Sequence, residues 1–152
     1  ASLVDLLIAE IRQVDGVAVE DVRPVKADRP DGSMAALSTA ATLVAAPAGE
    51  RLSTACAALR ALLDADWAVA LCMDGPTAVA ADGAPPELDW LAAFLLGSEH
   101  LEGGHEYTPG DLVWCRLPKA AVALAAGRAG RVFHARERDE FRVLGAIVDG
   151  LC

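Results

Sequence analysis

The stretch that decides the fold is residues 111–150, DLVWCRLPKAAVALAAGRAGRVFHARERDEFRVLGAIVDG. It opens with two apolar runs of strand length, residues 112–117 and 121–126, joined by Pro118-Lys119. A turn with Gly127 and Gly130 follows. The segment after it is polar at first and then repeats apolar residues at helical spacing: Phe141, Leu144, Ile147, Val148 and Leu151. The stretch therefore predicts two neighbouring antiparallel strands followed by an amphipathic helix.

A second hairpin is predicted upstream. Residues 67–73 form an apolar run in which Trp67, Val69 and Leu71 share one face and the alanines between them share the other. Asp74-Gly75 is a strong hairpin signal, and residues 77–81 are the return strand. Helical patterns cover residues 34–45, 49–64 and 86–97, and residues 98–110 form a polar, glycine-rich loop. This order predicts an α+β fold, an antiparallel sheet with helices packed on one face.

The N-terminal residues are predicted to form a small appendage. Residues 2–14 carry an apolar stripe at helical spacing, with Ser2 as N-cap and Asp5 three positions later. A strand is expected at residues 17–25, with Pro24 near its end indicating an edge. Residues 26–33 have turn chemistry and are expected to be a linker. The domains are therefore predicted at 1–25 and 34–152.

Composition narrows the classes of function. The 152-residue chain has a net charge of −9, and an acidic surface repels phosphate backbones, so we expect no nucleic-acid partner. No apolar run approaches the roughly 20 residues of a membrane span, and the N-terminus lacks the basic region of a signal peptide. The four cysteines show no C-x-x-C spacing, which favours reduced thiols and a cytoplasmic protein. Because the chain does not begin with Met, we expect a processed protein or a piece of a longer one.

These elements resemble known regulatory domains. The hairpin ADWAVALCMDGPTAVAADG and the closing LVWCRLPKAAVALAAGRAGRVFHARERDEFRVLGAIVDGL are similar to the first strands and the closing strands and helix of a GAF domain, over about residues 34–151. The segment DLLIAEIRQVDGVAVEDVRPV resembles the C-terminal helix and strand of an ACT domain, over about residues 2–25. The resemblance implies a GAF/PAS-like fold and a sensory or regulatory role. The chain lacks the cysteine context in which phytochrome-like GAF domains attach bilin, and it lacks the N-K-x-F-D-E signature of cyclic-nucleotide binding. The ACT loop that holds amino acids is also missing. The resemblance therefore implies no particular ligand for this chain.

Three aromatic residues with polar handles and one arginine are the candidates for a small-molecule site: Trp114, Trp90, Tyr107 and Arg116. By alternation, Trp114 shares a strand face with Leu112 and Arg116, opposite Val113, Cys115 and Leu117. If the Val113 face meets the helices, Trp114 and Arg116 point to the side where GAF-like sheets hold ligands. The alternative is that Trp67 and Trp114 simply fill the core.

Two weaker constellations carry other chemistry. His100, Glu102 and His105 are metal-ligand types around a glycine hinge, but the glycines break any helix and a solvated loop is the favoured interpretation. Cys115 beside Arg116, with His134 further on, has the residue types of a thiolate site, while its mid-strand position favours a structural cysteine. A disulfide between Cys72 and Cys115 requires their strands to be neighbours. We therefore assign no catalytic residue, no metal and no cofactor.

The favoured hypothesis is a non-enzymatic regulatory module that binds a small molecule or a protein partner. The alternative is a structural homodimerisation module, in which the N-terminal edge and apolar helix stripe pair with a second copy. A third hypothesis is a small metal- or thiol-dependent enzyme using His100, His105 and Cys115.

Overall fold

The computed structural model describes residues 2–19, 22, 31–99 and 110–152 of the chain. The chain forms two compact units, Ala1–Pro30 and Asp31–Cys152. The boundary falls inside the segment expected to be a linker, and helix α2 already begins at Gly32.

The described part of the first unit contains one helix, α1 (Leu3–Ile11). Its N-terminus is a capping box: the Asp5 backbone N–H donates to the Ser2 hydroxyl at 3.2 Å, and the Ser2 backbone N–H donates to the Asp5 carboxylate at 2.8 Å. No residue of α1 is buried, so its apolar stripe is exposed. The strand expected at residues 17–25 is not formed by residues 17–19 or 22, and the other residues of that range lie outside the described ones. A strand needs a paired neighbour, and the described part of this unit offers none.

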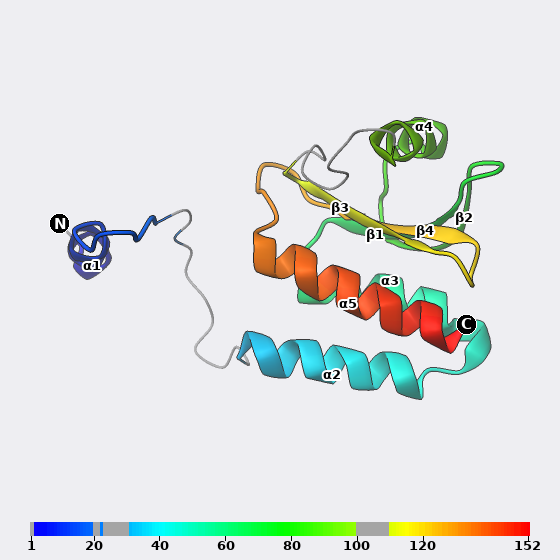
Figure 1. The fold of residues 1–152 in the computed structure, drawn as a ribbon, viewed down its shortest axis with the longest axis horizontal. Coiled ribbons are helices and arrows are strands. Elements are labelled where there is room, and N and C mark those ends of the chain that lie inside the picture. The colour runs from blue at the N-terminus through cyan, green and yellow to red at the C-terminus, as the bar shows by residue number, and fades with distance from the viewer. Residues whose placement is uncertain (1, 20–21, 23–30, 100–109) are drawn as a thin grey trace. The chain divides into compact units, whose positions relative to one another are not determined.

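The second unit is a layered α+β domain (Figure 1). Its elements are α2 (Gly32–Ala45), the 3₁₀ turn η1 (Ala48–Glu50), α3 (Arg51–Leu62), β1 (Trp67–Cys72), β2 (Thr77–Gly83), α4 (Leu88–Glu99), β3 (Leu112–Leu117), β4 (Val122–Gly127) and α5 (Ala135–Leu151). Helices α3 and α5 lie on one face of the sheet, α4 lies on the other, and α2 forms an outer layer against α3 and α5.

The four strands form one antiparallel sheet in the order β2-β1-β4-β3. Both predicted hairpins are present, and the two pair with each other through β1 and β4. Strands β3 and β4 lie side by side from Leu112 opposite Gly127 to Leu117 opposite Val122. The α+β fold and the strand pairing expected from the sequence are therefore confirmed.

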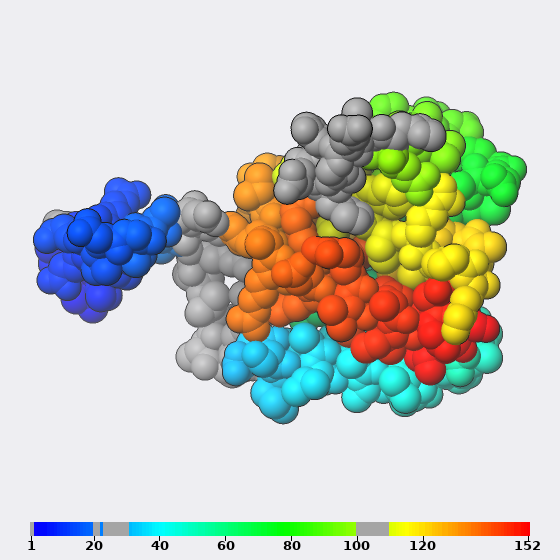
Figure 2. All heavy atoms as spheres, in the orientation of Figure 1, coloured from blue at the N-terminus to red at the C-terminus, as the bar shows by residue number. Residues whose placement is uncertain are grey.

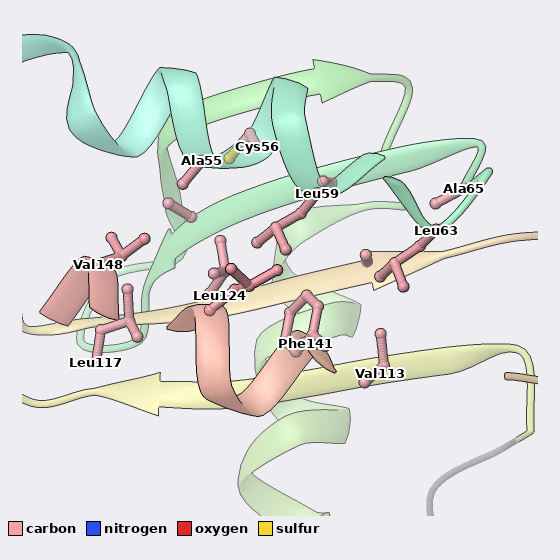
Figure 3. Packing of buried hydrophobic residues seen from close by; sticks show 14 of the residues in the cluster. Ala55, Cys56, Leu59, Leu63, Ala65, Val113, Leu117, Leu124, Phe141 and Val148 are labelled. Atoms are coloured by element: carbon pink, nitrogen blue, oxygen red, sulfur yellow. The ribbon is translucent and has the colours of Figure 1, made fainter. Parts of the chain in front are cut away.

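The main core lies between the sheet and the α3–α5 layer (Figure 3). Phe141 from α5 lies over the sheet near Leu124 and Val113, and Leu59 reaches the same region from α3. Phe141, Leu124 and Leu59 are completely buried, and burial of each such side chain stabilises the fold by about 2–3 kcal/mol. The apolar stripe of α5 is thus what closes the domain.

The opposite face of the sheet is apolar too, and this changes one detail of the expected architecture. Val69, Leu71 and Trp114 project there and are buried against Leu91 and Leu95 of α4. An antiparallel sheet leaves one face to water only when alternate residues are polar, and here they are not. Helices therefore cover both faces of the sheet, where the sequence analysis placed them on one.

Close contacts fix α5 against the sheet. A Cβ on Gly145 would lie 2.6 Å from the Sγ of Cys115, so only glycine allows this approach of α5 to β3. At the other end, the Asp149 carboxylate accepts hydrogen bonds from the backbone N–H groups of Lys119 and Ala120 in the β3–β4 turn. In the described part of the chain, no helix is both long and apolar enough to span a membrane.

Candidate functional site

Strand β3 carries the two leading candidates of the sequence analysis, Trp114 and Arg116. Its alternation places Val113 and Leu117 in the core with α3 and α5, and Trp114 on the opposite face of the sheet. Trp114 is 5% exposed and belongs to the buried cluster formed with α4. Both candidates therefore face the side of the sheet away from α3 and α5.

Helix α4 covers that side. Leu91, Ala92 and Leu95 recur at helical spacing and are buried against the sheet residues Val69 and Leu71. Among the described residues this face is filled by side chains. A ligand that reaches Trp114 must therefore move α4 or approach from its edge.

Arg116 lies at that edge and is held by Glu99, in the last turn of α4. The guanidinium donates from Nε to Oε1 at 2.5 Å and from Nη2 to Oε2 at 2.8 Å, a bidentate pair. The hydrogen bond to Glu99 raises the pKa of Arg116, and the charges of Glu99 and Asp74 act in the same direction. Arg116 is thus a fixed cation that matches a carboxylate or phosphate in shape.

The Arg116–Glu99 pair is also breakable. The two side chains are 44% and 30% exposed, and exposed pairs of this kind contribute about 1 kcal/mol or less. An external anion can therefore compete with Glu99 at little cost, whereas a buried pair would resist it.

The remaining aromatic candidates do not converge with Trp114 in the described structure. Trp90 is 55% exposed on α4 and stacks on Phe94, with ring centroids 5.5 Å apart. Tyr107 lies outside the described residues. A role for either of them in ligand binding stays a prediction.

The metal candidates His100, Glu102 and His105 also lie outside the described residues. Within the part of the chain that the structure describes, no group of three or more His, Cys, Asp or Glu side chains is arranged to hold a metal ion.

The thiol candidate is placed for packing. Cys115 points toward Gly145 of α5, while Arg116, next in the strand, lies on the other face of the sheet and pairs with Glu99. Burial raises the pKa of Cys115 to about 12, so its thiol stays protonated at neutral pH. The cysteines are free, and strand β4 separates Cys72 on β1 from Cys115 on β3, so the neighbouring strands that a disulfide requires are not present.

Glu99 is the residue that the sequence analysis missed. Its signal was the stripe that packs on the sheet, in which Leu88, Ala92 and Leu95 recur at intervals of four and three. Glu99, four residues after Leu95, continues this stripe with a carboxylate. An acidic residue on the sheet-facing stripe of a helix predicts a polar or cationic partner, and Arg116 on β3 is that partner.

The fold is similar to that of two solved structures. The GAF domain of phosphoenolpyruvate-protein phosphotransferase from Acinetobacter superposes with a TM-score of 0.53 at 11% identity, over 78% of this chain and 90% of that one. The wild-type phytochrome photosensory core module of Stigmatella aurantiaca superposes with a TM-score of 0.52 at 12% identity, over 79% of this chain. The protein spans only 36% of the length of that module.

At this level of identity the similarity concerns the fold alone: the second unit has a GAF-like α+β fold. No protein-family model matches the chain, and no curated protein matches it either.

Proposed function

We propose that this protein is a regulatory module, without catalysis of its own, that binds a small anionic molecule at Arg116 and responds by releasing the last turn of α4. The observation that carries the proposal is the bidentate pair between Arg116 on β3 and Glu99 on α4. The pair ties the last turn of a covering helix to the sheet through a partly exposed contact. A carboxylate or phosphate ligand would replace the Glu99 carboxylate on the same guanidinium.

The consequence for α4 follows from where it is anchored. Leu91 and Leu95 hold the middle of the helix on the sheet, while Glu99 fixes its end. When a ligand takes Arg116, the end of α4 loses its ionic contact and the apolar contacts remain. Binding would therefore change the order of the last turn of α4 without unfolding the domain, which is a local signal of the kind regulatory modules use.

The similarity to a GAF domain and to a photosensory module supports a regulatory role in general terms. The acidic net charge of −9 adds a constraint, because it disfavours anions everywhere except beside a fixed cation. Arg116 is such a cation on the face that the sequence analysis singled out.

The experiment is a titration of acetate, succinate and inorganic phosphate into three proteins, followed by calorimetry and by backbone NMR shifts. The Glu99→Gln variant lacks the competing charge and should bind the anion about fivefold more tightly than the wild type. The Arg116→Gln variant should lose the binding. Arg142→Gln is the matched control, because Arg142 is also an exposed arginine paired with a carboxylate, Asp139.

Two results would contradict the proposal. One is equal anion binding by the wild type and Arg116→Gln. The other is binding that shifts NMR signals elsewhere and leaves the last turn of α4 unchanged. Retained binding in Arg142→Gln is required, since its loss would indicate a general effect of charge.

For the first unit we propose an ACT-like origin, in which α1 is the closing helix of a domain whose other strands precede it. The exposed apolar side chains Leu3, Leu7 and Ile11 support this, because such a stripe is normally covered. Expression with any residues encoded upstream, followed by hydrogen exchange, tests it. Amide protection of α1 should rise in the longer chain, and unchanged protection would contradict the proposal.

A further inference from the structure

Helix α4 carries an exposed aromatic pair near its start. Trp90 is 55% exposed, and its ring stacks on Phe94 with the centroids 5.5 Å apart and the planes inclined by 13°. Phe94 itself packs against the buried cluster beneath α4. The stack therefore holds the indole in place while more than half of Trp90 stays accessible to solvent. A tryptophan that is ordered before binding is typical of the aromatic anchors of protein interfaces.

The surface around Trp90 is open. Figure 2 shows α4 (green) at the outer boundary of the domain, and no other described element lies beyond it. The positions three and seven residues after Trp90 are small and exposed, Ala93 and Gly97. A Cβ on Gly97 would meet nothing within 4 Å. A partner can therefore approach the indole along the helix without displacing a side chain at either position.

This part of the chain has a one-sided charge. Residues 61–99 contain no lysine or arginine and seven acidic residues. Four of the carboxylates are engaged, three by arginines from other segments and one by a backbone N–H: Asp64, Asp82, Glu99 and Asp66. The other three, Asp74, Glu87 and Asp89, form no ion pair within the described part of the chain. They leave a net negative charge on this side of the domain.

Two of these unpaired carboxylates flank Trp90. Asp89 is its neighbour in the first turn of α4, and Glu87 stands three residues before it, immediately ahead of the helix. Both residues are exposed. The face of an indole ring attracts cations, and nearby carboxylates attract them too. The two kinds of group therefore select the same ligand, a cation, whereas an uncharged apolar surface would select none.

We infer that the outer face of α4 docks a basic, arginine-bearing segment of another protein, with Trp90 as its anchor. Arginine fits this surface because a guanidinium stacks flat on an aromatic ring and keeps its N–H groups free to donate to carboxylates. Glu87 and Asp89 are the acceptors beside the ring. The inference does not depend on the anion site, since Arg116 contacts the other end of α4.

Charge distinguishes this partner from the alternatives. Nucleic acid and anionic membranes are repelled by the carboxylates beside Trp90. A second copy of this chain is a poor source of the cation, because the exposed arginines of α5 and of the segment before it are already paired with its own carboxylates: Arg131 with Asp64, Arg136 with Glu140 and Arg142 with Asp139. A basic segment of another protein meets no such competition.

The test is a titration of the full chain with a capped peptide of Arg-Gly repeats, followed through the indole N–H NMR signals of the three tryptophans. The Trp90 signal should shift and approach saturation by about 1 mM peptide, with weaker binding at higher salt. The signal of Trp114, which is buried, should not move. A Lys-Gly peptide should bind about threefold more weakly, because an ammonium does not stack, and a Gln-Gly peptide should not bind.

Substitution of Trp90 separates the aromatic ring from its apolar area. Trp90→Leu should weaken binding of the labelled Arg-Gly peptide, measured by fluorescence anisotropy, by about fivefold, whereas Trp90→Phe should weaken it by less than about twofold. Leu37→Ala, which trims a side chain that is 63% exposed on α2, should leave the affinity unchanged. Circular dichroism checks that each variant is folded.

A matched pair of variants tests the carboxylates. Glu87→Gln should weaken binding by about threefold. Glu50→Gln makes the same change at an exposed glutamate that also stands immediately before a helix, α3, and it should have no effect.

Three results would overturn the inference. One is a Trp90 signal that does not shift at about 1 mM Arg-Gly peptide in low salt. Another is equal weakening by Glu87→Gln and Glu50→Gln, which would reduce the binding to net charge. The third is a Trp90 signal that shifts with a neutral glucan oligosaccharide or with the Gln-Gly peptide as strongly as with the Arg-Gly peptide.

Discussion

Arg128 and Glu137 form a bidentate ion pair inside the domain, with Nη1–Oε1 and Nη2–Oε2 distances of 3.0 and 2.7 Å. The two side chains are only 2% and 17% exposed. Arg128 also lies 4.1 Å from the centre of the Phe133 ring and donates to the carbonyl of Leu63. This one guanidinium therefore joins the end of β4, the end of α3 and the start of α5.

Glu137→Ala should destabilise the fold by about 3 kcal/mol, since it leaves a buried arginine without its carboxylate. Urea denaturation monitored by circular dichroism measures the loss. Arg131→Ala is the matched control, because Arg131 pairs with Asp64 on the surface, where the side chains are 39% and 66% exposed. It should cost less than about 1 kcal/mol. Equal effects of the two substitutions would show that the buried pair is not special.

The Arg128–Glu137 pair should also make the stability of the fold depend on pH in the acidic range. Burial by itself would raise the pKa of Glu137, but the hydrogen bond from Arg128, the backbone N–H of His134 and the charge of Arg128 outweigh it and lower the pKa. A carboxylate with a lowered folded-state pKa stabilises the protein above its unfolded value of about 4.3. That contribution is lost as the pH falls through the folded value.

Glu137→Gln isolates this effect. The difference in unfolding free energy between the wild type and the variant should be constant from neutral pH to about pH 5 and should shrink as the pH falls below about 4.3. Urea titrations at several pH values measure it. A difference that stays constant or grows in acid would have the wrong sign for a lowered pKa.

Much of the fold could be predicted from the sequence. The run of residues 112–117 was recognisable as a strand because its length, turn residues and β-branched or aromatic content agreed, and the same held for the hairpin at Asp74-Gly75. The position of α4 was harder to predict from the sequence. Its stripe shows that it packs on something, but periodicity within a helix does not specify which face of a sheet receives it.

The site was predictable only in part. Alternation within β3 correctly set Trp114 apart from Val113, because neighbours in a strand face opposite ways. The partner of Arg116 lies 17 positions away in sequence, in another element, and only the tertiary packing of α4 brings Glu99 to it. Residues 34–45 were predicted as a helix, but which face of that helix is exposed follows from Leu43 occupying the inward face.

Gly145 offers a test of how closely α5 packs on β3. Gly145→Ala should destabilise the domain by about 1–2 kcal/mol, because the added Cβ would lie 2.6 Å from Cys115 Sγ and this clash exceeds the gain in helix propensity. Gly150→Ala, in the same helix, is the control: nothing lies within 4 Å of its added Cβ, and it should stabilise by less than about 1 kcal/mol. Thermal and urea denaturation measure both.

The double variant Cys115→Ala/Gly145→Ala identifies the cause. If the clash with Sγ is responsible, removal of the sulfur should make the double variant more stable than the sum of the two single changes predicts. Simple additivity would mean that Gly145 is required for another reason.

The cysteines should differ in their reaction with iodoacetamide at pH 8. Burial raises the pKa of Cys115 to about 12 and that of Cys56 to about 11, whereas Cys152 is exposed. Because only the thiolate reacts and Cys115 is almost fully protonated at pH 8, it should react about 1,000-fold more slowly than an ordinary cysteine. Mass spectrometry of timed digests should show Cys152 alkylated first, with Cys56 and Cys115 modified only after urea is added. Rapid modification of Cys115 in the folded protein would restore it as a candidate nucleophile and would weigh against the non-enzymatic role proposed above.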